Sequence, residues 1–474
     1  MSSIHLLPYE LLHHVVDVLR DDYQTLARCC LVNRDFSTTV SPFLYRCVKL
    51  RIGSLTQPEM IELHLQSACL HHNRLHVKVI VLEGSIGWRE PRSGTLIYAF
   101  QHLPNLQSVT LNMTGWVSPQ DNLNPSTFAR LFTLIRDLPS LTELVSNWVI
   151  GYPNDSVVAE LVKPELRKLK LISVSTGVIE HFPRWLRVAS KSLNELQIQT
   201  REWGPHYLSR FLSVFQMSAP SLHNLQTLQI GFLERSSDEG LFTALVHLPR
   251  LENLCLSYDL PFHRRSSFDP MSNTNALPFG SLPSPKSLKS FTLRYKTHSY
   301  DEYPLATNNV CRWIKHVISA SPIEELNFIP FYRPRTRNPV SKQSWDLLID
   351  HLADKHSKTL KYLDLRAAFV KKRSLETLLR KCHLLEELSI GTSRGSLFAF
   401  IRHSSDLLHL RRVRFELRTL KRGFDQTTAT SDEVTEVMKS APSLRRVIIN
   451  DSEWLGSWVL DGENGLKRII NKMV

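Results

Sequence analysis

Several features that mark whole classes of protein are missing from this 474-residue sequence. It has no run of about 18 consecutive apolar residues, the length that a membrane-spanning helix needs. The N-terminus has no basic stretch, and Pro8 and Glu10 stand where a secretory signal would be purely apolar. The seven cysteines are scattered and form no Cys-x-x-Cys pair, which argues against a disulfide framework and a zinc site. We therefore expect a soluble protein of the cytoplasm, the nucleus or both, without contact to a membrane.

Catalytic signatures are missing as well. The sequence has no Gly-x-Gly-x-x-Gly after a predicted strand, no phosphate-binding P-loop, no Gly-x-Ser-x-Gly elbow and no His-Glu-x-x-His helix. The adjacent histidines His13 and His14, and likewise His71 and His72, point in different directions on a helix and make poor metal ligands. We expect a protein that is not an enzyme and that uses no cofactor or metal.

The charge of the chain is uneven. Lys and Arg outnumber Asp and Glu by 13 overall. Residues 1–50 hold five basic and five acidic side chains, whereas residues 286–474 hold 33 basic and 21 acidic ones. The basic excess therefore lies in the C-terminal part, where it favours acidic partners. Nucleic acid has little further support, because the basic residues are not interleaved with aromatics and no known nucleic-acid-binding module is present.

The first 50 residues predict a small helical segment. The pair Leu7-Pro8 precedes the first helix, and Glu10 lies in its first turn, where a negative charge complements the helix dipole. A second helix is expected from Leu26 to Val32, followed by an exit strand around residues 44–48. Two short helices cannot bury all of their apolar side chains against each other. The remaining apolar residues must face the rest of the chain, as in a helical hairpin that caps a larger domain, or a partner.

The order of residues in this segment resembles an F-box. The family pattern opens with Leu-Pro, an acidic residue and a Leu pair, and it closes with Val-x-Arg-x-aromatic, matched by Val32, Arg34 and Phe36, where Phe36 replaces the usual Trp. The resemblance implies that residues 1–50 dock onto the small adaptor subunit of a cullin–RING ubiquitin ligase. Carried over residue by residue, the adaptor-binding surface comprises Leu7, Pro8, Glu10, Leu11, Leu12, Val15, Leu26, Cys30, Val32 and Phe36.

A repeated phrase fills most of the remaining chain. It consists of an apolar residue, two polar positions, an apolar residue, one polar position and another apolar residue, and it is often preceded by Leu-Pro or Pro-Ser. The copies begin at residues 106, 141, 166, 193, 225, 251, 288, 323, 360, 385, 410 and 444, with an irregular earlier copy at 74–82. The shorter steps match leucine-rich repeats of about 20–29 residues. The segments between the phrases have helical periodicity, so the pattern predicts stacked strand–helix units.

These repeats resemble the degenerate leucine-rich repeats that follow F-boxes in fungal proteins. We therefore predict an α/β fold in which a helical F-box is followed by an irregular leucine-rich-repeat solenoid, or horseshoe, over residues 51–453. Residues 454–474 are predicted to form a C-terminal cap with an amphipathic helix at Leu466–Met473. An ordinary α/β domain with a parallel sheet is the alternative.

The polar positions inside the phrases predict a binding surface. Side chains alternate between the two faces of a strand, so residues between the apolar anchors should lie on the concave side of the solenoid. Arginine binds carboxylates and phosphates through its two-pronged donors. We predict that an acidic or phosphorylated segment of a substrate protein binds there, and the alternative is a solvated basic surface without a specific ligand. The candidate residues are Arg294, Tyr362, Arg366, Arg412, Arg414 and Arg446.

The F-box resemblance implies a non-catalytic substrate-recognition subunit of a cullin–RING (SCF-type) ubiquitin ligase. The F-box would bind the adaptor and, through it, the cullin, while the repeats would hold an unidentified target protein for ubiquitin-dependent degradation. Two alternatives remain. One is a repeat scaffold whose F-box-like cap engages no ligase, and the other is a basic solenoid associated with nucleic acid.

Overall fold

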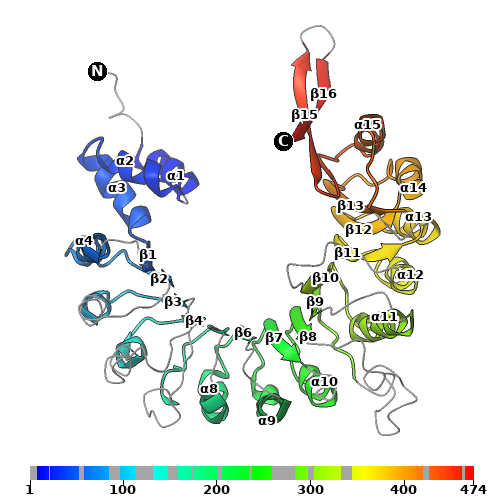
Figure 1. The fold of residues 1–474 in the computed structure, drawn as a ribbon. Coiled ribbons are helices and arrows are strands. Elements are labelled where there is room, and N and C mark those ends of the chain that lie inside the picture. Colours follow the sequence, from blue (N-terminus) through cyan, green and yellow to red (C-terminus); the bar gives the residue numbers. More distant parts are fainter. Residues whose placement is uncertain are drawn as a thin grey trace. The chain divides into compact units, whose positions relative to one another are not determined.

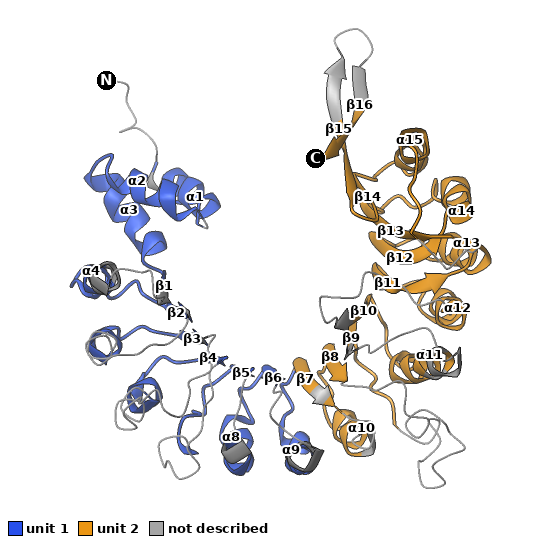
Figure 2. Cartoon of the chain, in the orientation of Figure 1, with its two compact units in different colours: residues 1–225 blue, residues 226–474 orange. Residues whose placement is uncertain are grey.

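The computed structural model describes residues 8–20, 22–52, 58–84, 97–113, 132–147, 159–172, 176–199, 205–233, 238–258, 283–296, 304–331, 344–419, 426–461 and 465–473. Leu7 lies outside these ranges, and so do most of residues 258–287 and 330–343. The chain forms two compact units, residues 1–225 and 226–474 (Figure 2). Within the described ranges, none of the helices combines the length and the apolar character that crossing a membrane requires.

Unit 1 begins with three helices, α1 (Tyr9–Val18), α2 (Tyr23–Cys30) and α3 (Arg34–Leu44). The side chain of Asp22 caps α2 by accepting a hydrogen bond from the Thr25 N–H at 3.1 Å. In the same way, Asn33 caps α3 by accepting from the Phe36 N–H at 2.8 Å. The sequence analysis missed α3 and placed a strand near its end, because Ser, Thr and an internal Pro42 are poor helix formers. The Asn33 cap and packing against the other two helices outweigh that propensity.

The rest of unit 1 alternates strands and helices. The strands are β1 (Cys47–Ile52), β2 (Val79–Gly84), β3 (Ser108–Met113), β4 (Glu143–Ser146), β5 (Lys168–Leu171) and β6 (Glu195–Ile198). They pair in parallel and in chain order. The helices between them include α4 (Pro58–Cys69), helical residues 97–102 and 132–137, η2 (Thr176–Glu180), α8 (Phe182–Ala189), α9 (Pro205–Ser218) and η3 (Ala219–Ser221). Strand β1 spans the boundary predicted between residues 50 and 51.

Unit 2 continues the same alternation. Its strands are β7 (Thr227–Leu233), β8 (Asn253–Tyr258), β9 (Ser290–Lys296), β10 (Glu325–Phe331), β11 (Tyr362–Val370), β12 (Glu387–Ser393), β13 (Arg412–Arg418), β14 (Arg446–Ile449), β15 (Ser452–Asp461) and β16 (Gly465–Met473). Its helices are α10 (Asp238–Val246), α11 (Pro304–Ile318), α12 (Asp346–Lys355), α13 (Lys372–Lys381), α14 (Gly395–His403) and α15 (Ser431–Ser440). In Figure 1 these helices follow one another along one side of the strands.

The predicted repeat phrases are confirmed as structural units. Each phrase from residue 106 onward supplies one strand, which begins two residues after the first apolar residue of the phrase. The apolar anchors are buried; Leu363, Leu388 and Val413, for example, are at most 2 % exposed. The chain is therefore a mixed α/β protein with a solenoid-like arrangement of repeats, while the horseshoe curvature stays a prediction.

Hydroxyl groups ahead of the strands join successive repeats. Ser287 donates to the Leu251 carbonyl at 2.8 Å, and Thr359 donates to the Ile323 carbonyl at 2.7 Å. Ser321 donates to the Pro285 carbonyl at 2.7 Å. These bonds satisfy carbonyl groups that the turns would otherwise leave unpaired. They give a structural role to the Ser or Thr that stands one or two residues ahead of several repeat phrases.

The predicted C-terminal helix is wrong. Residues 465–473 form strand β16, which pairs with β15 in an antiparallel hairpin, and β15 pairs with β14. The spacing of Leu466, Ile469, Ile470 and Met473 suits a helix, but the outer edge of β15 would then leave its backbone groups without strand partners. The hairpin provides those partners, and Lys472 lies over the Trp454 ring at 5.7 Å. Sheet pairing therefore outweighs the local helical pattern.

Replacing Asn450 by alanine should destabilise the last repeat. Among the described residues, Asn450 is the one non-glycine residue with a positive φ, 53°. Its side chain accepts from the Leu417 N–H at 2.9 Å and donates to the Thr427 carbonyl at 2.7 Å. Asn450→Ala removes both bonds and keeps a Cβ in the left-handed region, so we expect a loss of about 2–3 kcal/mol. Asn450→Gly relieves the backbone strain and should lose about 1 kcal/mol less. The measurement is the free energy of urea unfolding. If both variants lost the same amount, the positive φ of Asn450 would not contribute to the effect.

Candidate interaction sites

The three N-terminal helices have a core of their own. Leu12, Val16, Leu26 and Val40 are buried together, and partly buried residues such as Phe36 pack against them. The residues of α1 that face this core are Leu12 and Val16. Leu19, just after the helix, continues their helical spacing and is partly buried. A second apolar stripe on the same helix follows the spacing 11, 15 and 18, and its residues are exposed. The bundle is therefore complete without that second stripe.

The exposed apolar residues of these helices form the first candidate site. Val18 in α1 and Leu31, just after α2, are 84 % and 85 % exposed, and Val32 is also exposed. We define the apolar α1–α2 surface as Leu11, Val15, Val18, Leu31 and Val32. Apolar side chains this exposed on one small bundle are typical of a surface that a partner covers.

The residues assigned to the adaptor by resemblance fall into three groups. Pro8, Glu10, Leu11, Val15 and Val32 are exposed. Leu12 and Leu26 belong to the core, and Cys30 and Phe36 pack against it, so these four support the bundle from within. Leu7 lies outside the described residues. The sequence analysis did not select Val18 or Leu31, although the 11–15–18 spacing identifies Val18 as part of a second stripe.

Burial makes several of the cysteines less reactive. Burial raises the pKa of the Cys30 thiol, and it raises the pKa of Cys311 and Cys382 to about 12. A thiol with a raised pKa is a weak nucleophile, because the thiolate is the reactive form. Within the described ranges, no group of three or more His, Cys, Asp or Glu side chains is placed to hold a metal ion.

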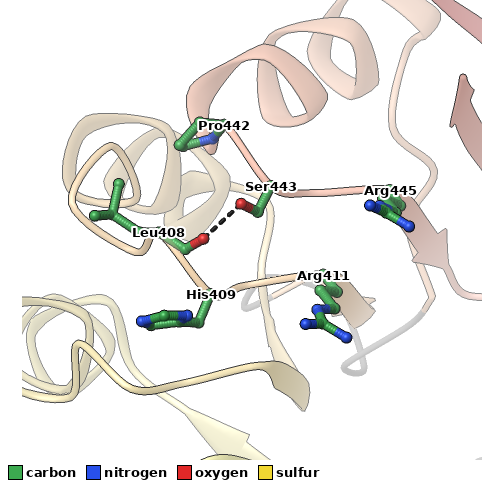
Figure 3. A pocket seen from close by; sticks show the side chains of 6 residues that line it. All are labelled: Leu408, His409, Arg411, Pro442, Ser443 and Arg445. Atoms are coloured by element: carbon green, nitrogen blue, oxygen red, sulfur yellow. Dashed lines mark hydrogen bonds between the residues drawn. The ribbon is translucent and has the colours of Figure 1, made fainter. Parts of the chain in front are cut away.

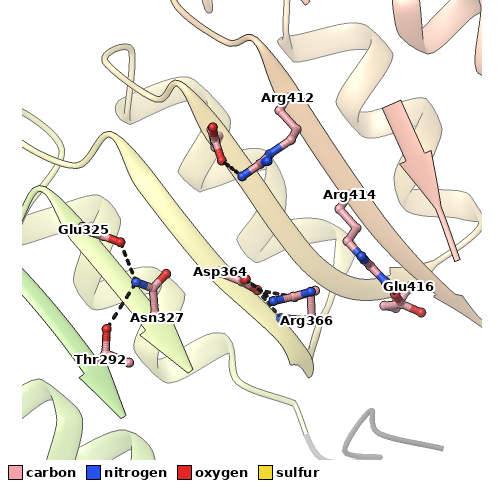
Figure 4. Close-up of polar contacts among 9 residues, drawn as sticks. Thr292, Glu325, Asn327, Asp364, Arg366, Arg412, Arg414 and Glu416 are labelled. Atoms are coloured by element: carbon pink, nitrogen blue, oxygen red, sulfur yellow. Dashed lines mark hydrogen bonds and ion pairs between the residues drawn. The ribbon is translucent and has the colours of Figure 1, made fainter. Parts of the chain in front are cut away.

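The predicted arginine surface of unit 2 lies on the strand face away from the helices, and most of its charge is paired within the protein. Arg412 forms an ion pair with Glu387 of the neighbouring strand. Arg414 pairs with Glu416 at 3.0 Å on its own strand (Figure 4). Arg412, Glu387 and Arg414 are only partly exposed, and Glu416 is buried. The carboxylates therefore neutralise the arginines that the sequence analysis singled out.

The other predicted residues also have partners among the described residues, except Arg294. Arg446 pairs with Glu453 at 2.8 Å, and Arg366 pairs with Asp364 at 2.7 Å. The Tyr362 hydroxyl donates to Glu386 at 2.9 Å, and this hydrogen bond raises the pKa of Tyr362. Among the five predicted arginines, Arg294 alone forms no ion pair with a described residue. The structure thus brings the predicted residues onto one strand face, but it gives most of them internal partners.

A polar cluster continues this face across β9 and β10. The Asn327 amide donates to Glu325 at 2.6 Å and to the Thr292 hydroxyl at 3.3 Å (Figure 4). Ser290 donates to the other oxygen of Glu325 at 2.9 Å. In-register pairing of the parallel strands puts these side chains next to one another. The strand face is therefore a preformed polar surface rather than a basic one.

Two histidines of unit 2 make its stability dependent on pH. The rings of His351 and His356 lie 5.5 Å apart. Burial, followed by the charge of His356, lowers the pKa of His351 from 6.5 to about 4, and burial lowers the pKa of His356. Between pH 6.5 and 4 the unfolded chain therefore binds more protons than the folded chain, so stability decreases as the pH falls through this window.

We expect His351→Gln to reduce this pH dependence. Because His351 is only half-buried, its share is about 1 kcal/mol between pH 7 and 4. The measurement is the free energy of urea unfolding of both proteins at several pH values. If the two proteins showed parallel pH profiles, His351 would not be the titrating group.

Comparisons with known proteins leave the family of the chain open. No protein-family model matches the sequence, and no curated protein matches it. Among solved structures, it is similar to the yeast Rad7–Elc1 complex, at 13 % identity over 90 % of this chain and 89 % of that chain, with a TM-score of 0.42. It is also similar to a Bacteroides fragilis protein, at 12 % identity over 80 % and 75 % of the two chains, with a TM-score of 0.29.

Proposed function

We propose that this chain is a substrate-recognition subunit of a cullin–RING (SCF-type) ubiquitin ligase. The apolar α1–α2 surface would bind the small adaptor subunit and, through it, the cullin. The repeats would hold a target protein, and the site of action would be the cytoplasm or the nucleus. The single observation that carries the proposal is the exposed second stripe of α1, which lies within the segment whose residue order resembles an F-box.

The exposed stripe of α1 is separate from the core of the bundle. The core of the bundle is formed by Leu12, Val16, Leu26 and Val40, so Leu11 and Val15 contribute little to it. Left in water, such side chains add no stability. Covered by a partner, each Leu or Val contributes about 1.5–3 kcal/mol. The proposal requires that a partner covers these five residues in one contact, where they would supply enough burial for specific, stable binding.

The proposed role requires no catalytic side chain. A receptor of this kind holds its target near a ubiquitin-charged partner and thereby raises the effective concentration of the target lysine. The paired, preformed strand face of unit 2 suits a binding role, because its side chains are already held in place before the target arrives. The identity of the target would be decided by polar contacts on that face.

The experiment is a calorimetric titration of the full-length chain with the purified adaptor subunit. We expect a one-to-one complex of micromolar or tighter affinity, whose negative heat-capacity change reports apolar burial. If no heat is evolved and the two proteins do not co-elute in size exclusion, the proposal is wrong. The chain would then be a repeat scaffold whose helical cap serves another purpose.

A further inference from the structure

A row of charged residues crosses unit 2 where its parallel strands begin. The residue before each strand from β8 to β14 is charged, and its backbone N–H donates to the carbonyl of the preceding member. We call this row the charge ladder; its members in order are Glu252, Lys289, Glu324, Lys361, Glu386, Arg411 and Arg445. The sign alternates over the first six members. It then repeats, because Arg445 follows Arg411.

The alternating part of the charge ladder is neutralised internally. Lys289 pairs with Glu252 at 2.9 Å, and Lys361 pairs with Glu324 at 2.7 Å. The contact with Glu324 raises the pKa of Lys361, as expected for an ammonium group beside a carboxylate. Glu386 accepts the Tyr362 hydroxyl rather than an arginine. Little net charge is therefore available to a ligand along these members.

The last two members of the charge ladder, Arg411 and Arg445, have the same sign and are not neutralised by an ion pair with a described residue. The Arg445 N–H donates to the Arg411 carbonyl at 2.8 Å, so the two arginines extend from adjacent strands that lie about 4.8 Å apart. Both side chains are exposed, and neither guanidinium forms an ion pair with any residue that the structure describes. Two like charges this close repel each other. An anion that accepts hydrogen bonds from both would remove that repulsion.

A pocket of about 390 Å³ lies at this point. Figure 3 shows Arg411 and Arg445 together on one side of it, with His409 and Leu408 on the other. The Ser443 hydroxyl donates to the Leu408 carbonyl and so ties together the two turns that frame the pocket. The volume exceeds what a single phosphate needs and falls within the range of ligand-binding clefts. It leaves room for the residues that flank a modified side chain.

We propose that this pocket binds the phosphoryl group of a phosphoserine or phosphothreonine in a partner protein. A phosphate monoester carries close to two negative charges and three acceptor oxygens, so it can accept hydrogen bonds from both guanidinium groups at once. Leu408, which is 62 % exposed, and Pro442 provide apolar contact for the neighbouring peptide residue. This inference goes beyond the proposed function, because it involves no residue of α1–α3 and is tested without the adaptor.

Nucleic acid does not fit the same charges. A nucleic-acid strand needs a continuous basic track along its backbone. Here the charge ladder alternates before Arg411, and the neighbouring Arg412, Arg414 and Arg446 are paired with carboxylates. Along the charge ladder and these neighbouring strand positions, the unpaired charge is therefore confined to Arg411 and Arg445, which suits a single phosphoryl group.

The test is fluorescence anisotropy with the full-length chain and labelled pools of short peptides that have degenerate flanking residues. One pool carries a central phosphoserine, one carries serine and one carries glutamate. We expect the phosphoserine pool to bind at least about tenfold more tightly than either of the others. The double variant Arg411→Gln/Arg445→Gln should bind the phosphoserine pool no more tightly than it binds the serine pool. Inorganic phosphate should compete with the phosphoserine pool.

The control is the double variant Arg312→Gln/Arg402→Gln, which removes two exposed positive charges of α11 and α14 elsewhere on unit 2. It has the same net charge as the test variant and should bind the phosphoserine pool like the wild type. If both double variants lost affinity equally, the effect would be one of overall charge and the site would be refuted. Equal binding of the glutamate pool, or displacement of the phosphopeptide by single-stranded DNA alone, would also overturn the proposal.

Discussion

The double substitution Leu11→Asp/Val15→Asp is expected to abolish adaptor binding while the fold remains intact. Both side chains are exposed and belong to the second stripe of α1, so the bundle core does not depend on them. In the complex, each substitution removes about 1.5–3 kcal/mol of apolar burial and places an unpaired carboxylate in the contact. The combined loss corresponds to at least roughly a 100-fold decrease in affinity, measured by calorimetry.

A matched control separates a specific surface from a general effect of added charge. Val246 at the end of α10 is exposed to a similar degree as Val15, and it lies in unit 2. Val246→Asp should bind the adaptor like the wild type. If Leu11→Asp/Val15→Asp bound with unchanged affinity, the apolar α1–α2 surface would not be the docking site. The circular dichroism spectra of all three proteins establish that each is folded.

Phe400→Ala should produce the largest loss of stability among single substitutions in α14. Phe400 is fully buried, and its ring meets Phe415 of β13 edge-to-face with centroids 5.3 Å apart. Truncation removes this contact and leaves a cavity between the helix and the sheet. Such changes cost about 3–5 kcal/mol. Because each repeat is stabilised by its neighbours, the loss should extend to the adjoining repeats of unit 2.

The same helix supplies the control for this prediction. Phe398 lies two residues earlier and is 54 % exposed. Phe398→Ala should change the free energy of urea unfolding by less than about 0.5 kcal/mol. Similar losses for the two variants would mean that the helix does not pack on the sheet through Phe400.

The repeat architecture could be predicted because its signal is long and periodic. The spacing of apolar anchors such as Leu360, Leu363 and Leu365 recurs many times, and each copy reinforces the others. Two elements were not predicted correctly: α3 was missed, and β16 was predicted as a helix. Both depend on tertiary contacts. Helix α3 has a local start signal in the Asn33 cap, but its weak helix formers also need the surface of α1 and α2, and β16 needs a partner strand. Neither contact is visible in local sequence patterns.

The candidate sites were predictable only in part. The strand alternation correctly brought Arg412 and Arg446 to the same face and the same register. It could not show that Glu387 and Glu453 pair with them, since those carboxylates come from other strands. For the same reason, the sequence alone does not distinguish Arg411 and Arg445, which lack an ion pair with a described residue, from the neutralised Arg412 and Arg446. Side-chain pairing across strands is a property of register, which the sequence does not reveal directly.

The most direct test of the proposed function is hydrogen–deuterium exchange of the full-length chain with and without the adaptor subunit. Exchange reports local opening, so residues covered or stabilised by the partner are slowed. We predict slower exchange in residues 8–20 and 22–36, with β7–β14 unchanged. Protection of the strands of unit 2 without protection of α1 and α2 would contradict the claim that the apolar α1–α2 surface docks the adaptor.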